Sequence, residues 1–391
     1  MRILFLDQSG ELGGAELCLL DVAKPYRDHS VVALLADGPF RAALEQHQIP
    51  VQVLTARSLQ IRKQSGLWQG LSSLRQLLPL AVRVSQLSQG FDLIYANTQK
   101  ALVVGALASG LGRRPLVYHL HDILSEEHFS SVNRRLAVLL ANQFAAQVIT
   151  NSEATRSAFV AAGGQSRLTS VIYNGFDPAT YQAADRDVVR RSLGLTGFVV
   201  GQFSRLSPWK GQHVLLEALT NCSADVTALF VGSALFGEQE YAQQLQAQVT
   251  ALGLQDRVRF LGFRSDVIPL MHACDLVAHT STAPEPFGRV IVEAMLCGRP
   301  VVASAAGGAI ELVESGSTGW LVPPNDPQAL AAAIREAQAQ PDTASAIGDR
   351  AQQQASQRFD LLTIQRQIAE QLQQVSQGKP VGNPAPCRDP P

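Results

Sequence analysis

Two carboxylates flank the apolar stretch EPFGRVIVE, Glu285 at its start and Glu293 at its end. The pattern predicts a helix from about Phe287 to Cys297, with Gly298 as its stop, so Glu293 lies in the helix and Glu285 precedes it. At ~1.5 Å per residue, the helix separates the two carboxylates by roughly 12 Å along its axis. Paired glycosidase carboxylates stand roughly 5–5.5 Å or 6.5–9.5 Å apart, so a hydrolase pair fits poorly. The spacing suits two carboxylates that accept hydrogen bonds from hydroxyls of one extended ligand. The competing interpretation is a helix-dipole role for Glu285 and a solvated Glu293.

A second group of residues could bind an anion. Arg205 and Lys210 in GQFSRLSPWKGQ follow an expected strand and precede an expected helix. Two cations beside a helix N-terminus favour a diphosphate, although a solvated Arg and Lys around a Ser-Pro turn is about equally consistent with this stretch alone. The backbone amides of Phe287, Gly288 and Arg289, at the start of the other helix, would face the same anion.

Glycine turns follow other apolar runs. Gly13 and Gly14 in SGELGGAE end one such turn, and Gly307 and Gly308 in ASAAGGAIELV end another. The first turn lacks the spacing G-x-G-x-x-G, so a nicotinamide or flavin cofactor is disfavoured. A glycine turn alone is more often a packing feature than a phosphate site.

The stretch VYHLHD places His119 and His121 at the end of a strand, with Asp122 after them. Alternation along a strand points both imidazoles the same way. Histidines at a strand end are usually satisfied structural groups, and these have no evident third ligand in the sequence, so we expect no metal site.

These residues need a scaffold that brings strand ends together. Short β-branched runs alternate with helix-length segments, first through residues 1–152 and again from FVVGQFSR (198–205) to GWLVP (319–323). Near-continuous apolar strands that alternate with helices predict parallel sheets covered on both faces, and hence an α/β protein. We expect two doubly wound Rossmann-like domains, residues 1–180 and 181–375, whose ligands bind at the carboxyl ends of the strands in a cleft between them. The C-terminal helices would pack back on the first domain, and residues 376–391, rich in proline, would be disordered.

Length and composition narrow the function classes. With 391 residues, 46% of them hydrophobic and 17% charged, the sequence suits two globular domains. A formal charge of -1 gives no nucleic-acid footprint. The five cysteines have no C-x-x-C spacing, no apolar run reaches membrane-spanning length, and the start MRILFLD is too short for a signal-peptide core, so we expect a reduced, cytoplasmic protein.

Several of these motifs occur together in a fixed order. The glycine loop 9–14, HLHD, SRLSPWKG, EPFGRVIVEA, GGAIELV and STGWLVPPND follow one another along the chain. Together they resemble family 4 of the retaining nucleotide-sugar glycosyltransferases, over about residues 1–375 and most specifically in the second half. The resemblance implies the GT-B fold, in which two Rossmann-like domains face each other across a deep cleft.

The resemblance also implies roles for individual residues. Arg205 and Lys210 would hold the donor diphosphate, Glu285 the hydroxyls of the transferred sugar and Glu293 the ribose. Gly13 and Gly14 would approach the donor phosphate, Arg264 would lie along the base, and Phe287, Gly288 and Arg289 would present amides to the sugar and diphosphate. His121 corresponds to a histidine near the transferred sugar, with His119 as the alternative register.

The implied reaction transfers a hexose-type sugar, with retention, from a nucleotide diphosphate sugar to a hydroxyl of a glycan or lipid-linked acceptor. It would serve cell-surface polysaccharide or glycolipid synthesis and need neither cofactor nor metal. Preorganised cations and amides would stabilise the leaving diphosphate. A non-catalytic nucleotide-sugar or glycan-binding protein and a GT-B nucleotide-sugar epimerase are the alternatives.

The segment between Glu45 and Asp92, where we look for an acceptor-binding surface, has an uneven distribution of charge. Between Glu45 and Asp92 the chain has no acidic residue, whereas it contains five basic residues and one tryptophan: Arg57, Arg62, Lys63, Trp68, Arg75 and Arg83. A basic amphipathic surface of this kind can lie on anionic lipid, so we expect peripheral contact with the inner face of the membrane. A solvated helix with a basic face is the simpler alternative.

Overall fold

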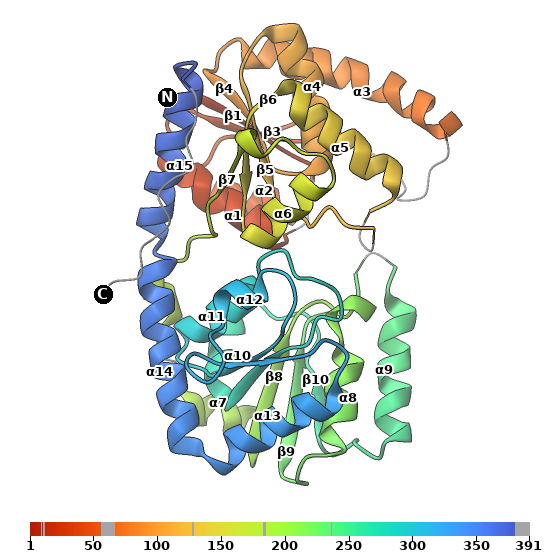
Figure 1. The fold of residues 1–391 in the computed structure, drawn as a ribbon, viewed down its shortest axis with the longest axis vertical. Coiled ribbons are helices and arrows are strands. Elements are labelled where there is room, and N and C mark those ends of the chain that lie inside the picture. The colour runs from red at the N-terminus through yellow and green to blue at the C-terminus, as the bar shows by residue number, and fades with distance from the viewer. Residues whose placement is uncertain are drawn as a thin grey trace. The chain divides into compact units, whose positions relative to one another are not determined.

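The computed structural model describes residues 1–8, 10, 12–55, 67–126, 129–182, 185–235 and 237–379, with side chains in the first part of the third helix, residues 67–76, excepted. These residues form two compact units, each organised around one sheet (Figure 1). The first unit comprises Met1–Gly175 and the segment from Leu361 onward, and the second comprises Phe176–Asp360. The division at Gly175 lies a few residues before the position expected from the sequence.

The first unit contains a parallel sheet in the order β3-β2-β1-β4-β5-β6-β7. Its strands are β1 (Ile3–Asp7), β2 (Val31–Leu34), β3 (Val51–Val53), β4 (Leu93–Ala96), β5 (Leu116–Leu120), β6 (Ala145–Thr150) and β7 (Thr169–Val171). The helices are α1 (Gly14–Ala23), α2 (Pro39–Gln46), α3 (Leu67–Ser88), α4 (Gln99–Gly112), α5 (Ser131–Phe144), α6 (Glu153–Ala161) and α15 (Leu361–Ser376), with short 3₁₀ turns at Lys24–Tyr26 and Ser166–Leu168.

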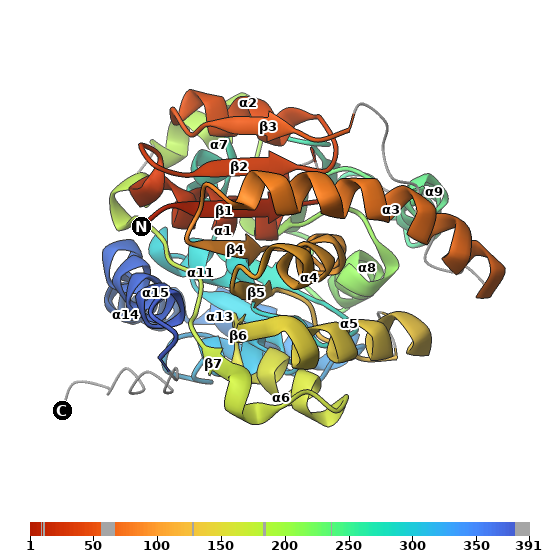
Figure 2. The same cartoon turned by 90° about the horizontal axis from the view of Figure 1, so that it is seen from above.

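Strand alternation explains why this sheet has a core on each face. Leu4 and Leu6 of β1 belong to a cluster shared with α3, α4 and α5, which lie side by side in Figure 2. Ile3 and Phe5 point to the opposite face, where α1, α2 and α15 pack. From α15 come the buried residues Ile364, Ile368, Leu372 and Val375, so this C-terminal helix is part of the first unit's core.

The second unit repeats the plan with a parallel sheet in the order β10-β9-β8-β11-β12-β13. Its strands are β8 (Phe198–Phe203), β9 (Val226–Val231), β10 (Val258–Phe260), β11 (Leu276–His279), β12 (Val301–Ser304) and β13 (Trp320–Val322). The helices are α7 (Arg186–Leu193), α8 (Gln212–Leu219), α9 (Gln239–Ala251), α10 (Val267–Ala273), α11 (Arg289–Leu296), α12 (Ala309–Leu312), α13 (Pro327–Ala339) and α14 (Pro341–Arg358), with 3₁₀ turns η3 (Pro178–Tyr181) and η4 (Pro208–Lys210).

Each sheet has one point at which the strand order reverses. In the first unit the chain builds outward from β1 through β2 to β3 and then returns to place β4 on the other side of β1. The second unit does the same between β8 and β11. Ligands of doubly wound sheets bind at the carboxyl ends of the strands beside such a switch point. The α/β doubly wound class expected from the sequence is therefore confirmed.

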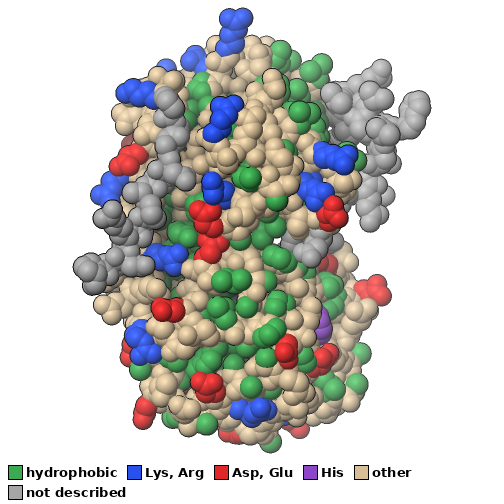
Figure 3. Space-filling model, in the orientation of Figure 1, with side chains coloured by type: hydrophobic (Ala, Val, Ile, Leu, Met, Phe, Trp, Pro, Cys, Tyr) green, Lys and Arg blue, Asp and Glu red, His purple; other side chains and the backbone are tan. Residues whose placement is uncertain are grey.

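Two expectations fall largely on residues that the structure does not describe. In the basic segment, Arg57, Arg62 and Lys63 and the side chains of Trp68 and Arg75 lie outside the described residues, whereas Arg83 donates a hydrogen bond of 2.7 Å to the carbonyl of Leu54. The tail expected to be disordered is described only as far as residue 379, three residues beyond α15. Among the described helices, none has the length and apolarity that crossing a bilayer requires. On the face drawn in Figure 3, acidic and basic side chains are interspersed.

Candidate functional site

The switch point of the second unit brings together two loops that are distant in sequence. One loop follows β8 and carries Arg205 and Lys210, and the other follows β11 and carries Glu285. Since β8 and β11 are neighbours in the sheet, their carboxyl ends meet at one edge. This adjacency brings the two loops into contact.

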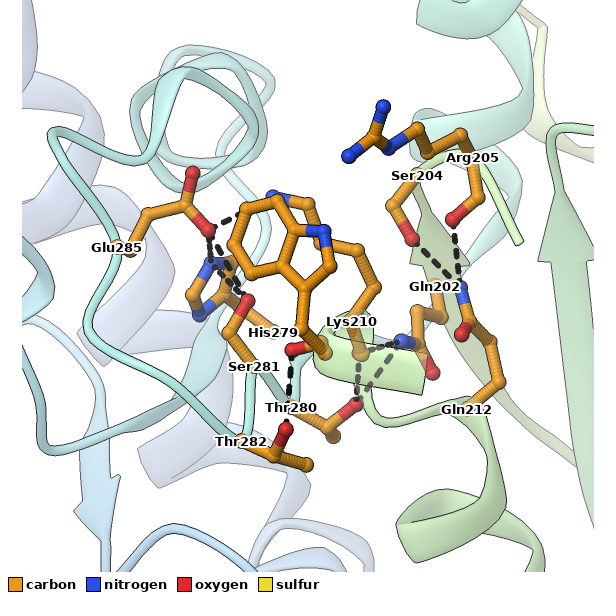
Figure 4. A network of polar contacts seen from close by, with 11 residues as sticks. Gln202, Ser204, Arg205, Lys210, Gln212, His279, Thr280, Ser281, Thr282 and Glu285 are labelled. Carbon is orange, nitrogen blue, oxygen red and sulfur yellow. Dashed lines mark hydrogen bonds and ion pairs between the residues drawn. The ribbon is translucent and has the colours of Figure 1, made fainter. Parts of the chain in front are cut away.

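Glu285 is held by three donors at a single oxygen atom (Figure 4). Its Oε2 lies 2.7 Å from Nζ of Lys210, 3.0 Å from Oγ of Ser281 and 3.1 Å from Nε2 of His279. None of the described residues donates to the other oxygen, Oε1, which points away from these donors in Figure 4. The carboxylate is thus fixed in orientation by contacts to one of its two oxygens.

The charge of Glu285 is set by the same contacts. Its side chain is only 12% exposed, and burial opposes ionisation. The nearby Lys210 and His279 outweigh that penalty, and the net effect lowers the pKa of Glu285 well below its ordinary value. At neutral pH this residue is therefore a buried carboxylate that can accept, but not donate, hydrogen bonds.

Polar contacts to the backbone fix the position of Lys210. Nε2 of Gln202, at the end of β8, donates to the carbonyl of Lys210 at 2.8 Å, and Oγ1 of Thr280 donates to that carbonyl at 3.0 Å. Gly211 has a positive φ of 67°, and a Cβ there would lie 2.0 Å from the carbonyl oxygen of Thr280. Only glycine lets the two loops approach this closely.

Trp209 contacts both cations of its loop. Nζ of Lys210 lies 3.9 Å from the centre of the indole, and the guanidinium carbon of Arg205 lies 5.7 Å from it. Nε2 of Gln212 donates a hydrogen bond of 2.9 Å to the backbone carbonyl of Arg205 and so fixes the backbone at this residue. The indole thus contacts both positive charges of its loop.

The glycine pair after β12 supports the Glu285 loop from the other side. The amide of Gly308 donates to the carbonyl of Glu285 at 2.7 Å. Gly307 has φ 62°, and a Cβ at this position would lie 2.3 Å from the same carbonyl oxygen. This turn packs against the loop that positions the carboxylate, which explains the requirement for glycine.

The helix after Glu285 begins later than the sequence pattern indicated. The helix α11 spans Arg289–Leu296, so Phe287 and Gly288 precede it. The physical reason is that Gly288 adopts a left-handed φ of 103°, which a helix interior does not accommodate. The Phe287 ring is buried, stacked on Phe176 and packed edge-on against Phe359.

Arg289 and Glu293 lie on one face of α11. Nε of Arg289 is 3.5 Å from Oε1 of Glu293, and the guanidinium carbon lies 4.5 Å from the ring centre of Phe176. Glu293 therefore has a cation partner on its own helix. As expected, Glu293 lies within the helix and Glu285 outside it.

Arg264 lies further along the same edge of the sheet, after β10, which is separated from β8 by β9. Its guanidinium forms a bidentate pair with Asp266, at 2.7 and 2.5 Å, on the exposed surface. The structure therefore places Arg264 away from the contacts that join Lys210 and Glu285.

The remaining sequence candidates lie in the first unit, at the switch point between β1 and β4. Gly13 is the N-cap of α1 and Gly14 is its first residue. The carboxyl group of Glu16 folds back toward the backbone of Gly13, as the glutamate of a capping box does, although Gly13 has no side chain to complete the box. Burial and the neighbouring Asp7 and Asp122 raise the pKa of Glu16 to about 8.

The two histidines differ in their surroundings. His121 is half-buried, and its Nε2 lies 2.8 Å from Oδ1 of Asn97. His119 is 1% exposed, and its Nδ1 lies 2.5 Å from the hydroxyl of Tyr95. Burial and the neighbouring His121 lower the pKa of His119 well below its ordinary value, so His119 is neutral. Of the two imidazoles, that of His121 is the more exposed.

Several residues of the second unit's site were not predicted from the sequence. His279 and Ser281 contact the carboxylate, and Trp209 contacts both cations. A signal was present, since His279 and Ser281 end the strand run DLVAHTS, and polar residues at a strand's carboxyl end are candidates for a ligand site. The aromatic neighbour Phe176 could not be identified in this way, because it lies more than a hundred residues from Arg289 in the chain.

Comparison with known proteins is consistent with this architecture. Residues 185–354 match the family model described as glycosyl transferases group 1, and residues 13–175 match the glycosyl transferase 4-like domain. The crystal structure of Anabaena Alr3699/HepE in complex with UDP-glucose is similar to this chain, with a TM-score of 0.89 and 59% sequence identity, over 95% of this chain and 99% of that one. The two doubly wound units thus constitute the GT-B fold.

Curated relatives point the same way. A D-inositol 3-phosphate glycosyltransferase of Geodermatophilus obscurus is 28% identical over 377 residues, which cover 87% of this chain and 81% of the relative. One from Mycobacterium sp. (strain KMS) is 31% identical over 60% of this chain and 56% of its own length. With both halves matched and a relative of 59% identity along nearly its whole length, the chain belongs to the group 1 glycosyltransferases.

Proposed function

We propose that this protein transfers glucose from UDP-glucose, with retention of anomeric configuration and without a metal ion, to a hydroxyl of a glycan or lipid-linked acceptor. The observation that carries the proposal is the preformed Lys210–Glu285 pair at the switch point, where a fixed cation and an ionised carboxylate with one available oxygen lie side by side. The relative at 59% identity, which binds UDP-glucose, supports the choice of donor. The resemblance to family 4 supports retention.

In this proposal, Lys210 and Arg205 bind the donor diphosphate. Cleavage of the bond between the anomeric carbon and the phosphate oxygen leaves the electron pair on UDP, and the two cations stabilise the added negative charge. Because Trp209 and the backbone contacts hold both cations before the donor arrives, little reorganisation accompanies the reaction. Backbone amides at the start of α11, after Phe287 and Gly288, would add to this stabilisation.

Glu285 would orient the transferred sugar. Its Oε1 is available to accept hydrogen bonds from sugar hydroxyls while Oε2 remains anchored, and Glu293 would accept from the ribose. Arg264 would contact the base after exchanging part of its pairing with Asp266. In the first unit, Gly13 and Gly14 would approach the donor phosphate and His121 the transferred sugar.

The proton of the acceptor hydroxyl must leave as the new bond forms. We assign its removal to the leaving phosphate oxygen, because the Glu285 carboxylate has a pKa too low for an effective base at neutral pH. The acceptor oxygen then attacks from the face that the phosphate has left, which retains the configuration.

For the acceptor, we propose a lipid-linked or surface-polysaccharide hydroxyl and peripheral docking at the inner face of the membrane. The helix α5 supports a surface of this kind, since Val132, Leu136 and Leu139, one helical face, are 64, 42 and 62% exposed, with Arg134 and Arg135 beside them. Flotation with anionic and neutral vesicles tests the docking, and equal recovery with both would remove it from the proposal.

Binding and turnover of UDP-glucose test the donor assignment directly. A thermal-shift panel of nucleotide sugars is expected to show the largest rise in apparent Tm with UDP-glucose, since a ligand that binds the native state stabilises it by mass action. Release of UDP with an acceptor extract would then establish transfer. Tight UDP-glucose binding with no transfer to any acceptor would favour a non-catalytic binding protein, and formation of an epimerised nucleotide sugar would favour the epimerase.

A further inference from the structure

Three side chains that could bind a soft metal ion converge in the first unit, close to the switch point between β1 and β4. Cys18 lies on α1, His119 on β5 and His121 directly after β5. One candidate ligand atom from each, a sulfur and two imidazole nitrogens, lies within 4.8 Å of the other two. The sequence offered only the two histidines, because the thiol that completes the group is about a hundred residues away in the chain.

The hydrogen bonds around His121 define its tautomer. Nδ2 of Asn97 donates both of its hydrogens, one to Oδ2 of Asp7 at 2.7 Å and one to the carbonyl of Ala15 at 3.0 Å. The atom of Asn97 that faces His121 is therefore the amide oxygen, which can only accept. Nε2 of His121 must carry a hydrogen, so in the neutral imidazole Nδ1 is the nitrogen that can bind a metal ion.

His119 shows the complementary arrangement deeper in the unit. Its Nδ1 faces the hydroxyl of Tyr95, whereas its Nε2 is buried and has no hydrogen-bond partner among the described residues. A buried polar atom without a partner is unfavourable unless something else satisfies it. A metal ion would satisfy it, and the lowered pKa keeps His119 in the neutral form that metals bind.

We propose that Cys18, His119 and His121 form a binding site for Zn²⁺, with one thiolate and two imidazoles as ligands. Each histidine then directs its second ring nitrogen at an oxygen, of Tyr95 or of Asn97, as metal-bound histidines usually do. Binding replaces the thiol proton of Cys18, which passes to the solvent. Three protein ligands leave a fourth position of the tetrahedron for water.

Zinc binding at this site would affect sugar transfer, and this consequence rests on the function proposed above. His121 is the histidine assigned to the transferred sugar, so a metal ion that binds it withdraws the imidazole from the donor. We therefore expect Zn²⁺ to inhibit transfer reversibly, and a chelator to restore it. Metal binding itself does not depend on the proposed function and is measured separately.

The test uses the full chain, stripped of metal, and follows binding before activity. Titration with Zn²⁺ against a chromophoric chelator is expected to give one tight site, and Co²⁺ is expected to show a thiolate charge-transfer band. Cys18→Ala should lose the band and at least a hundredfold in Zn²⁺ affinity, while the matched control Cys222→Ala, a thiol of the second unit, should keep both. Absence of a tight site, or unchanged binding by Cys18→Ala, would overturn the proposal.

A second variant examines His119 without truncating a ligand. Tyr95→Phe removes only the hydroxyl that orients this imidazole, and we expect it to keep the Co²⁺ band but to weaken Zn²⁺ binding by roughly 10–100-fold. Unchanged affinity would show that the Tyr95 hydroxyl does not orient a metal-bound His119. In the activity assay, Cys18→Ala should keep its basal transfer rate and resist Zn²⁺ at concentrations that saturate the wild type. Inhibition of both alike would show that Zn²⁺ acts elsewhere.

Discussion

At the carboxyl edge of the second unit's sheet, Glu285 is buried against Lys210, whereas at the corresponding edge of the first unit Glu16 is buried beside Asp7 and Asp122. The two carboxyl groups have similarly low exposure, and their pKa values move in opposite directions, down for Glu285 and up to about 8 for Glu16. Burial alone raises the pKa of both. The sign of the nearest charge decides the outcome.

This difference suits the roles proposed for the two edges. A donor diphosphate carries fixed negative charge, so its site needs fixed positive charge that does not vary with pH. The edge of the first unit instead contains groups that burial keeps neutral, His119 among them. The two units share a doubly wound topology but differ in their chemistry, because different side chains follow their strands.

Removal of the Lys210 cation in the second unit is expected to have the largest effect on turnover. Lys210→Ala should lower kcat/KM for UDP-glucose at least a hundredfold, about 2.7 kcal/mol of transition-state stabilisation, because the leaving diphosphate loses a fixed charge. Steady-state UDP release measures this, with circular dichroism to verify the fold. The exposed Lys379→Ala serves as the matched control and should retain wild-type turnover. Near-normal turnover of Lys210→Ala would contradict the diphosphate role.

Substitution of Glu285, the carboxylate partner of Lys210, should have the next largest effect, on both turnover and stability. Glu285→Gln keeps the shape but leaves Lys210 without its counter-charge, so we expect kcat to fall by roughly tenfold or more and stability to fall by about 2 kcal/mol. The apparent Tm and kcat should change together. A Gln variant with normal turnover would show that the carboxylate serves only the fold.

The pH dependence of this variant is a separate readout. The folded-state pKa of Glu285 is depressed, so its contribution to stability is present above the unfolded value near 4.5 and is lost as the pH falls below it. Wild type should therefore lose more stability than Glu285→Gln on acidification below pH 4.5. Parallel acid unfolding curves for the two proteins would contradict the assigned ionisation.

In the first unit, substitutions of the two histidines should have different effects, one on turnover and the other on stability. His121→Ala is expected to lower kcat about tenfold with little change in apparent Tm, because the residue is half-buried and is proposed to contact the transferred sugar. His119→Ala should lower Tm, because it leaves a buried cavity beside Tyr95. The reverse pattern, with a kinetic defect confined to His119→Ala, would assign the sugar contact to His119.

The sequence predicted the fold class more completely than the site. Apolar runs that alternate with helical spacing identify parallel strands because burial on both faces leaves a strong local signal, and the doubly wound class was confirmed. The start of α11 was predicted two residues too early. The reason is that the left-handed backbone of Gly288 follows from its packing, not from its neighbours in sequence. Domain bounds and residue roles stay predictions.

Contacts within the site follow from strand order, which one sequence does not supply. Lys210 and Glu285 could be identified separately by motif, yet their ion pair requires β8 and β11 to be adjacent. His279 carries an ordinary strand-end signal and becomes a partner of Glu285 only through the turn between them. The proximity of Cys18 to His119 and His121 has the same origin, since α1 and β5 meet only in the folded unit.

At Glu16, the comparison of the two carboxyl groups can be tested by stability alone, without an activity assay. Its folded-state pKa of about 8 exceeds the unfolded value of 4.5, so between these values the folded protein binds the extra proton. Stability should therefore fall as the pH rises from about 5 to 8, by at most ~1.4 kcal/mol per pH unit. The decline is opposite in sign to the effect of Glu285.

Glu16→Gln removes the titration and keeps an acceptor for the N-terminus of α1, so it should flatten this decline in apparent Tm between pH 5 and 8. Glu153→Gln, at the exposed start of α6, is the matched control and should preserve the wild-type slope. If wild type and Glu16→Gln show the same slope, then Glu16 is ionised like Glu285, and its contacts with the backbone amides at Gly13 outweigh the repulsion from Asp7. The two edges would then share one electrostatic design, and the difference between them would lie in the cations alone.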